Sequence, residues 1–165
     1  MDQDESYFLR TYDAYHNDIY RFCLMKVSTE ALAQDLTQEV FMRFWQQLRK
    51  GVEMKHDRAF LYTIARNLII DSYRKKKESS LDALTEQGVD FSGLEHVKIE
   101  EAAQMSEVLR VVNQLDDDAR EAVLLRFVEG FSPKEIAEIS GESANAVSVR
   151  LNRAIKKIQT LIHAT

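Results

Sequence analysis

The chain contains few of the residues that interrupt helices or cross-link a fold. Its 165 residues include one cysteine, one proline and five glycines. So few breakers argue against an all-β fold, which needs a turn about every 8–12 residues, and they favour an all-α fold. A single cysteine cannot form an internal disulfide, which is typical of a protein in a reducing cytoplasm.

The sequence also lacks the marks of membrane insertion and secretion. No apolar run approaches the ~20 residues of a membrane span. The acidic start, Met1–Glu5, does not have the basic-then-apolar order of a signal peptide. We therefore expect a cytoplasmic protein without direct membrane insertion.

Signatures of catalysis and metal binding are missing as well. The chain has no P-loop, dinucleotide-binding, zinc-protease, paired-cysteine or nucleophile-elbow motif. Its four histidines are scattered without ligand spacing. We expect no enzyme activity, no catalytic residue, no metal and no cofactor.

Charge is distributed unevenly along the chain, although the net charge is only −5. Residues 58–77 hold six basic residues and one acidic residue, and residues 143–165 hold four basic residues and no acidic one. Residues 78–118, between these basic islands, hold eleven acidic and two basic residues. DNA responds to local potential within a Debye length of ~8–10 Å, so each island is a candidate nucleic-acid contact. We also hypothesise that the acidic stretch folds against the basic surfaces in the free protein.

Helical periodicity divides the chain into two domains. Apolar residues at steps of three or four predict three helices in the first part, over residues 5–27, from the Ser28–Thr29 cap to Gly51, and over 58–77. Serines, glycines and acids then replace the apolar residues. We expect two small helical domains, residues 1–77 and 99–165, joined by a flexible acidic linker over 78–98.

The second domain contains a helix-turn-helix pattern. A helix capped by Asp116–Asp118 is expected to carry the apolar residues Ala122, Val123, Leu125 and Phe127 and to stop at Gly130. Ser132–Glu135 is a capping box with proline at the first helical position, Ser140–Glu142 is a glycine turn, and Ser143 caps a last helix.

The last helix is the candidate reader of duplex DNA. Val147, Leu151, Ala154 and Ile158 are predicted to face inward. The predicted DNA-facing residues are Ser143, Asn145, Ser148, Val149, Arg150, Asn152, Arg153 and Lys157. Its basic stripe at 150, 153 and 157 suits phosphates. The alternative is an ordinary helical hairpin with a solvated basic face.

The helix over 58–77 is the second candidate. Arg66, Arg74 and Lys75 alternate with Tyr62 and Asn67. Cations of this kind hold a nucleic-acid backbone, and aromatic rings stack on unpaired bases. The alternative is a helix that ends in basic residues for its dipole, with the tyrosines half-buried.

Two blocks of sequence resemble regions 2 and 4 of an extracytoplasmic-function (ECF) sigma factor, a small member of the sigma-70 family. Region 2 is similar to Asp35–Phe41 with Arg43 and Trp45, and to Phe60–Asp71. Region 4 is similar to Leu115 through Ile158, especially to the segments 124–132 and 135–138. The resemblance covers nearly the whole chain outside the linker.

The resemblance implies a role for each surface. Region 2 would dock on the β′ clamp helices of core RNA polymerase through Asp35, Gln38, Glu39 and Arg43. Region 4 would contact the β flap and place its last helix on the −35 promoter element. The implied −10 contacts are Lys55, His56, Tyr62, Arg66, Asn67, Arg74 and Lys75. The family also implies an anti-sigma factor as a partner.

The last helix departs from the family pattern. The family usually reads Thr-Val-Lys-Ser-Arg where this chain has Ala146–Arg150. A phosphate-binding hydroxyl and a lysine are replaced by Ala146 and Ser148. We therefore carry over no standard −35 sequence, and we expect the salt slope of DNA binding to be smaller by about one unit.

Two other functions remain open on sequence grounds. The chain could be a transcription regulator that binds DNA alone, in which case changes at Asp35 or Gln38 would have no effect. It could also be a sigma-like decoy that binds polymerase without directing transcription from promoters.

Overall fold

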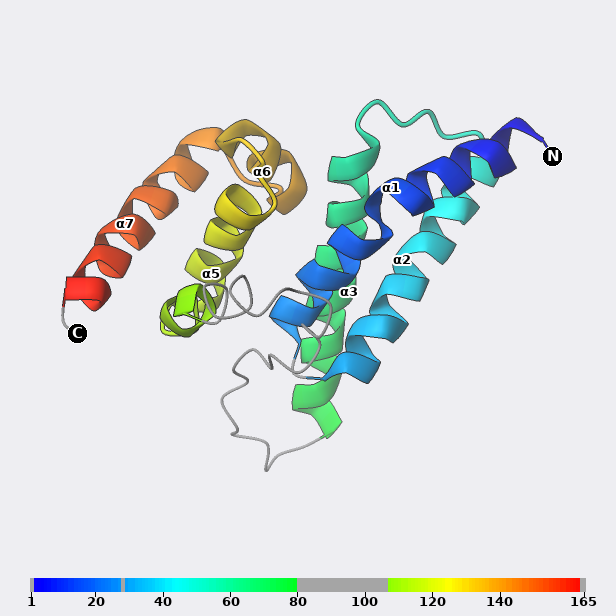
Figure 1. The fold of residues 1–165 in the computed structure, drawn as a ribbon. Coiled ribbons are helices and arrows are strands. Elements are labelled where there is room, and N and C mark those ends of the chain that lie inside the picture. The colour runs from blue at the N-terminus through cyan, green and yellow to red at the C-terminus, as the bar shows by residue number, and fades with distance from the viewer. Residues whose placement is uncertain (1, 28, 80–106, 164–165) are drawn as a thin grey trace. The chain divides into compact units, whose positions relative to one another are not determined.

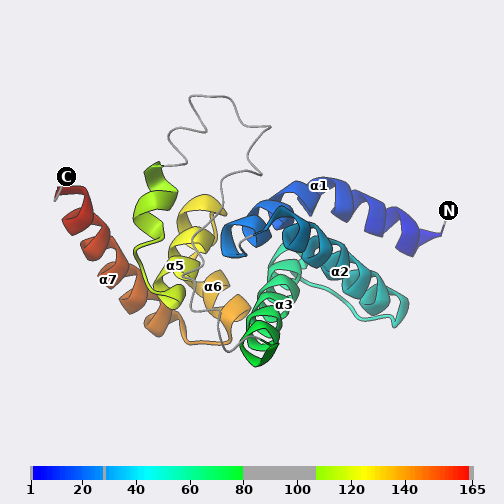
Figure 2. The same ribbon diagram turned by 90° about the horizontal axis from the view of Figure 1, so that it is seen from below.

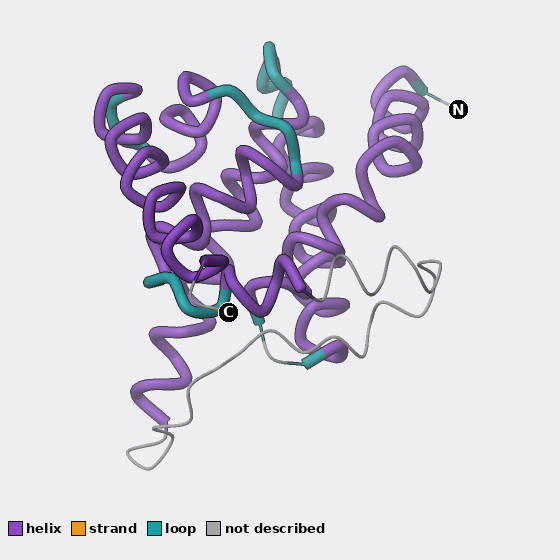
Figure 3. The backbone as a smooth tube through the Cα atoms, turned by 60° about the vertical axis from the view of Figure 1, so that its left-hand side comes forward, coloured by secondary structure: helices purple, strands orange, loops and turns teal. Residues whose placement is uncertain are grey.

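The structure, a computed structural model, describes residues 2–27, 29–79 and 107–163, and their regular secondary structure is helical throughout (Figures 1 and 3). The expectation of an all-α fold is confirmed. The chain divides into two compact units, Met1–Gln87 and Gly88–Thr165. That division falls inside the expected linker, which lies outside the described residues from residue 80 onward.

The first unit is a bundle of three helices, α1 (Gln3–Lys26), α2 (Glu30–Arg49) and α3 (Asp57–Ser79). Each packs against the other two (Figure 2). Thr29 caps α2 as the sequence predicts, because its hydroxyl accepts a hydrogen bond from the Leu32 N–H at 3.2 Å. The bundle places one outer face of α2 and one of α3 in solvent.

The core of the first unit is rich in aromatic residues and is shielded from solvent. Its fully buried residues are Ile19, Phe22, Cys23, Ala33, Val40, Phe44, Leu61, Tyr62 and Ala65. Phe8 of α1 stacks on Phe44 of α2 with 6.1 Å between ring centroids and meets Trp45 edge-on at 5.4 Å. These contacts fix the packing of α1 on α2, because aromatic pairs favour such geometries.

The second unit contains a helical segment over residues 107–112, then α5 (Asp117–Val123), η2 (Leu124–Val128), α6 (Pro133–Ser140) and α7 (Ala144–His163). Its buried residues come from each of these segments and from the loop before α6, and they include Leu109, Ala122, Leu124, Leu125, Phe131, Ile136 and Val147. Helix α7 packs on both α5 and α6. One face of α7 is therefore fixed against the core and the other is left outside.

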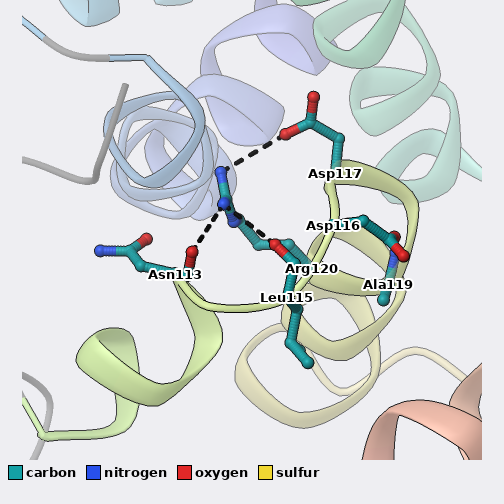
Figure 4. Close-up of polar contacts among 6 residues, drawn as sticks. All are labelled: Asn113, Leu115, Asp116, Asp117, Ala119 and Arg120. Atoms are coloured by element: carbon teal, nitrogen blue, oxygen red, sulfur yellow. Dashed lines mark hydrogen bonds and ion pairs between the residues drawn. The ribbon is translucent and has the colours of Figure 1, made fainter. Parts of the chain in front are cut away.

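Arg120 ties the start of α5 to the segment before it. Its guanidinium donates to the carbonyl oxygens of Asn113 at 3.0 Å and Leu115 at 3.2 Å, and it pairs with the Asp117 carboxylate at 3.4 Å (Figure 4). Asp116 caps α5 by accepting from the Ala119 N–H at 2.8 Å. Carbonyls that would otherwise lack a helical partner are thus satisfied.

A π-helical turn corrects one sequence prediction. Residues Leu124–Val128 form η2, in which the Glu129 N–H reaches the Leu124 carbonyl at 3.0 Å. Leu124 and Leu125 are buried, but Phe127, an apolar residue of the same segment, is 59% exposed. The expected helix is therefore not a regular α-helix up to Gly130, because the wider turn advances each residue by a smaller angle than an α-helix does.

The helix-turn-helix forms as the sequence predicts. The Ser132 hydroxyl accepts from the Glu135 N–H at 3.2 Å, and the Glu135 carboxylate accepts from the Ser132 N–H at 3.0 Å. Gly141 ends α6 in the left-handed conformation, with φ 74°. The Ser143 hydroxyl then accepts from the Ala146 N–H at 3.1 Å at the start of α7.

Candidate nucleic-acid interface and protein-docking face

The outer face of α2 is polar and open to solvent. Asp35, Gln38, Glu39 and Arg43 are all exposed, and their spacing places them on one side of the helix. We call these four residues the docking face. The Arg43 guanidinium lies 3.0 Å from the Glu39 carboxylate, and both side chains remain about half exposed. So exposed a pair adds little stability and leaves both groups available to a partner.

An apolar groove lies beside the docking face, between α1 and α2. It has a volume of about 520 Å³. Its lining residues are Glu5, Phe8, Leu9, Tyr12, Gln38, Phe41, Met42 and Trp45. Leu9 and Met42 are 45% and 59% exposed. The sequence analysis missed this groove, although Met42, an apolar residue on the outer side of α2, was a signal for it.

The first basic surface follows α3 and the loop before it. Lys55, His56, Asn67, Arg74 and Lys75 are exposed, and Arg66 is half-buried. Asn67 and Arg74 lie two turns apart on the same side of α3. At 1.5 Å per residue, the surface extends roughly 12 Å from Asn67 to Lys75 along the helix. Most of the expected −10 residues are thus accessible.

Tyr62 is the exception among these residues. Its side chain is 0% exposed. The ring meets Phe22 of α1 edge-on at 5.2 Å, and the Arg58 guanidinium lies 5.4 Å from its centroid. A base needs an open ring face for stacking, so Tyr62 is a core residue in this structure. We remove it from the candidate DNA contacts.

The second basic surface is the outer side of α7. Its exposed members are Ser143, Asn145, Val149, Asn152, Arg153 and Lys157, and its half-buried members are Ser148 and Arg150. Val147, Leu151 and Ala154 are buried on the opposite side, as predicted, whereas Ile158 is only half-buried. The helix therefore presents short polar side chains and cations together.

Acidic residues stand close to this second surface. A cleft of about 780 Å³ lies between the start of α5 and helix α7. One side is formed by Asp116, Asp117 and Asp118, and the other includes Arg150, Arg153 and Lys157. The Arg150 guanidinium also binds the carboxylate of Glu142, with 2.6 Å from Nη1 to Oε1 and a second contact from Nη2 to Oε2.

The hydrogen bond to Glu142 raises the pKa of Arg150, and the nearby charges of Glu142, Asp118 and Glu121 raise it further, against the effect of burial. Sequence reasoning missed Glu142, because a contact across the turn to a residue eight positions away follows no helical spacing. No periodic signal could have found it.

Within residues 2–27, 29–79 and 107–163, no cluster of histidine, cysteine or acidic side chains is arranged to hold a metal ion. None of the helices described is both long enough and apolar enough to cross a membrane.

Two family models match the chain, one in each unit. The first, Sigma-70 region 2, matches residues 11–79, and the second, Sigma-70 region 4, matches residues 105–158. The first matched range contains the docking face and the first basic surface. The second contains the helix-turn-helix and the second basic surface. Two helical units that carry these regions in this order define an RNA polymerase sigma factor of the sigma-70 type.

Individual relatives narrow the class. The ECF RNA polymerase sigma factor BldN of Streptomyces coelicolor is 31% identical over 94% of this chain and 60% of BldN. The ECF RNA polymerase sigma factor SigM of Bacillus subtilis is 32% identical over 91% of each chain. The sigma factor RpoE of Bartonella quintana, solved in complex with the anti-sigma factor NepR, has a TM-score of 0.79 at 25% identity, covering 94% of this chain and 96% of that one. This chain therefore belongs to the ECF sigma factors of the sigma-70 family.

Proposed function

We propose that this chain binds core RNA polymerase in the cytoplasm and directs it to promoters, where it supports DNA melting and the start of transcription. One observation carries the proposal. A single chain holds two separate helical units, each with an exposed basic surface, in the order of sigma regions 2 and 4. Phosphodiester chemistry is left to the polymerase, and this chain supplies recognition.

The docking face is the proposed contact with the β′ clamp helices. Its mixture of carboxylates, amide and guanidinium is unsuited to a phosphate backbone, whereas it suits a polar protein surface. The apolar groove shares Gln38 with this face, so a helix seated there would bury Leu9 and Met42 as well. In the second unit, region 4 is proposed to contact the β flap.

The first basic surface is the proposed −10 contact. The loop residues Lys55 and His56 and the α3 residue Asn67 would hold a flipped-out base, while Arg66, Arg74 and Lys75 would hold the strand. Flipping one base costs roughly a few kcal/mol. Phosphate contacts and polymerase binding offset this cost, so the protein needs no aromatic wedge at Tyr62.

The second basic surface is the proposed −35 contact, with α7 in the major groove. Asn145, Ser148 and Asn152 have short side chains that can bond base edges, and Val149, 41% exposed, can meet a thymine methyl. Ser143, Arg153 and Lys157 would contact phosphates. Arg150 belongs to this surface by position, although its guanidinium is bound to Glu142.

An anti-sigma factor is a further proposed partner. The Bartonella quintana relative was solved with the anti-sigma factor NepR. The docking face and apolar groove of this chain give such a protein a place to compete with polymerase.

Runoff transcription with purified core polymerase on genomic DNA fragments tests the proposal. Asn67→Ala is expected to lower promoter-dependent transcripts about five- to 150-fold, because a lost base contact is worth about 1–3 kcal/mol. It should leave polymerase binding unchanged. Gln38→Ala is expected to weaken polymerase binding, and Gln34→Ala, an exposed residue of α2 outside the docking face, is the matched control.

Two results would contradict the proposal. Specific duplex binding without polymerase, unaffected by Gln38→Ala, would identify an independent DNA-binding regulator. Polymerase binding without any promoter-directed RNA would identify a decoy.

A further inference from the structure

Glu142 and Arg150 form a bidentate ion pair that joins the turn of the helix-turn-helix to α7. Glu142 lies in the turn, where its N–H donates to the Ala137 carbonyl at 3.1 Å. Its two carboxylate oxygens accept from the two terminal nitrogens of Arg150, in the second turn of α7. The side chains keep only 28% and 26% exposure, so the pair is partly shielded from water.

This ion pair occupies the guanidinium N–H donors that would otherwise bind a DNA phosphate. A guanidinium binds carboxylates and phosphates through the same fork of parallel N–H groups. When Glu142 occupies both terminal nitrogens, a phosphate must displace it or accept a poorer contact. The negative charges of Asp118 and Glu121 also attract Arg150, which raises its pKa and stabilises the charged guanidinium in this position.

The other two cations of the stripe have different surroundings. Arg153 and Lys157 are exposed, and neither takes part in an ion pair with a residue of the described ranges. A stripe of three cations thus contains two that are open to solvent and one that is already bound to a carboxylate.

We propose that Glu142 competes with DNA phosphate for Arg150 and thereby weakens the grip of α7 on DNA. The proposal rests on the proposed function of α7 as a DNA-binding helix. Glu142 acts through Arg150 rather than by touching DNA, so it is a residue that sets affinity. Arg150 forms its full contact with a phosphate when the carboxylate is displaced or removed.

The test compares charge-matched variants of the full chain. Glu142→Gln removes the competing carboxylate. Glu138→Gln, at an exposed position of α6 in the same helix-turn-helix, removes one negative charge without touching Arg150. Binding to a random-sequence DNA duplex is measured by fluorescence anisotropy from 50 to 200 mM salt, together with binding to a heparin column. Circular dichroism confirms that each variant is folded.

Glu142→Gln is expected to bind the duplex about two- to fivefold more tightly than Glu138→Gln, which corresponds to an ion pair that water still reaches. Its slope of log K against log salt should be steeper by about one unit, for one additional phosphate contact. Arg150→Gln should abolish the gain in the Glu142→Gln background, and it should cost the wild type less affinity than it costs Glu142→Gln. Equal binding of the two Glu→Gln variants, or equal losses from Arg150→Gln in both backgrounds, would overturn the proposal.

Two further comparisons cover the cases in which Glu142→Gln does not fold or the proposed function itself fails. If Glu142→Gln unfolds, Arg150→Gln is compared with Arg153→Gln, and Arg153→Gln should flatten the salt slope more than Arg150→Gln does; equal flattening overturns the proposal. If the duplex and heparin effects appear while runoff transcription shows no promoter dependence, the proposed function fails and the competition by Glu142 stands.

Discussion

Truncation of Tyr62 tests whether this residue belongs to the core or to the DNA surface. Its ring is fully buried and meets Phe22 at 5.2 Å. Removing a buried aromatic side chain costs about 3–5 kcal/mol. A unit of about 80 residues is stabilised by roughly 4–12 kcal/mol in total, at about 0.05–0.15 kcal/mol per residue. Tyr62→Ala should therefore remove a large part of the stability of the first unit.

Urea unfolding followed by tryptophan fluorescence measures this loss. Trp45 is the single tryptophan of the chain and lies on α2, so its signal reports the first unit alone. Tyr62→Ala should lower the free energy of unfolding by about 3–5 kcal/mol. Ile70→Ala, at a position of α3 that is 37% exposed, is the control and should lower it by less than about 1 kcal/mol.

The stacking role makes the opposite prediction. If Tyr62→Ala left the unfolding free energy unchanged and weakened binding to single-stranded −10 DNA, the ring would have to be accessible to bases, and its assignment to the core would be refuted. Tyr62→Phe, which keeps the ring, should change neither quantity substantially.

Three other properties follow from the structure. Burial raises the pKa of the Cys23 thiol to about 12, so the folded protein should resist iodoacetamide at pH 8, and rapid labelling without denaturant would contradict this burial. Burial and a hydrogen bond with Asp57 raise the pKa of Tyr7 to about 12 from its ordinary 10.0; its contribution to stability is complete below pH 10 and is lost as the pH rises from 10 through 12, so the difference in urea midpoint between wild type and Tyr7→Phe should shrink over that window and not below it. Gly141→Ala should lower the stability of the second unit by about 1–2 kcal/mol in thermal unfolding, because the left-handed φ of 74° strains any residue with a Cβ; an unchanged transition would show that the turn can adopt another conformation.

Local signals predicted the helix boundaries well. Thr29, Asp116 and Ser132 cap helices through bonds to an N–H three residues later, and Gly141 ends α6 as expected. Such interactions lie within one turn of helix and depend on few residues. They can therefore be read from a short stretch of sequence.

Positions that depend on the packing of several elements were predicted less well. On α3, Leu61, Ala65 and Leu68 recur at helical spacing and are buried, yet Tyr62 and Ile69 are buried too. Helix α3 packs against both α1 and α2, so its buried arc is wider than one stripe. A single amphipathic pattern cannot show how many neighbours a helix will have.

In the candidate site, too, features set by local sequence were predictable and features set by the packing of several elements were not. The exposure of Asp35, Gln38, Glu39 and Arg43 follows from helical periodicity and was predictable. The π-turn that exposes Phe127 depends on the closing of the chain at Gly130, where the Phe131 N–H reaches the Leu125 carbonyl at 2.9 Å. No pattern of apolar residues carries that information.

The contacts of Arg120 have a mechanical consequence. Because one guanidinium grips the backbone at Asn113 and Leu115 and also the side chain of Asp117, bending the chain between these points would break several hydrogen bonds at once. We therefore expect residues 113–117 to resist bending, so that the segment 107–112 and α5 move together. Helix α7 packs directly on α5, so a displacement of this segment would also press on α7.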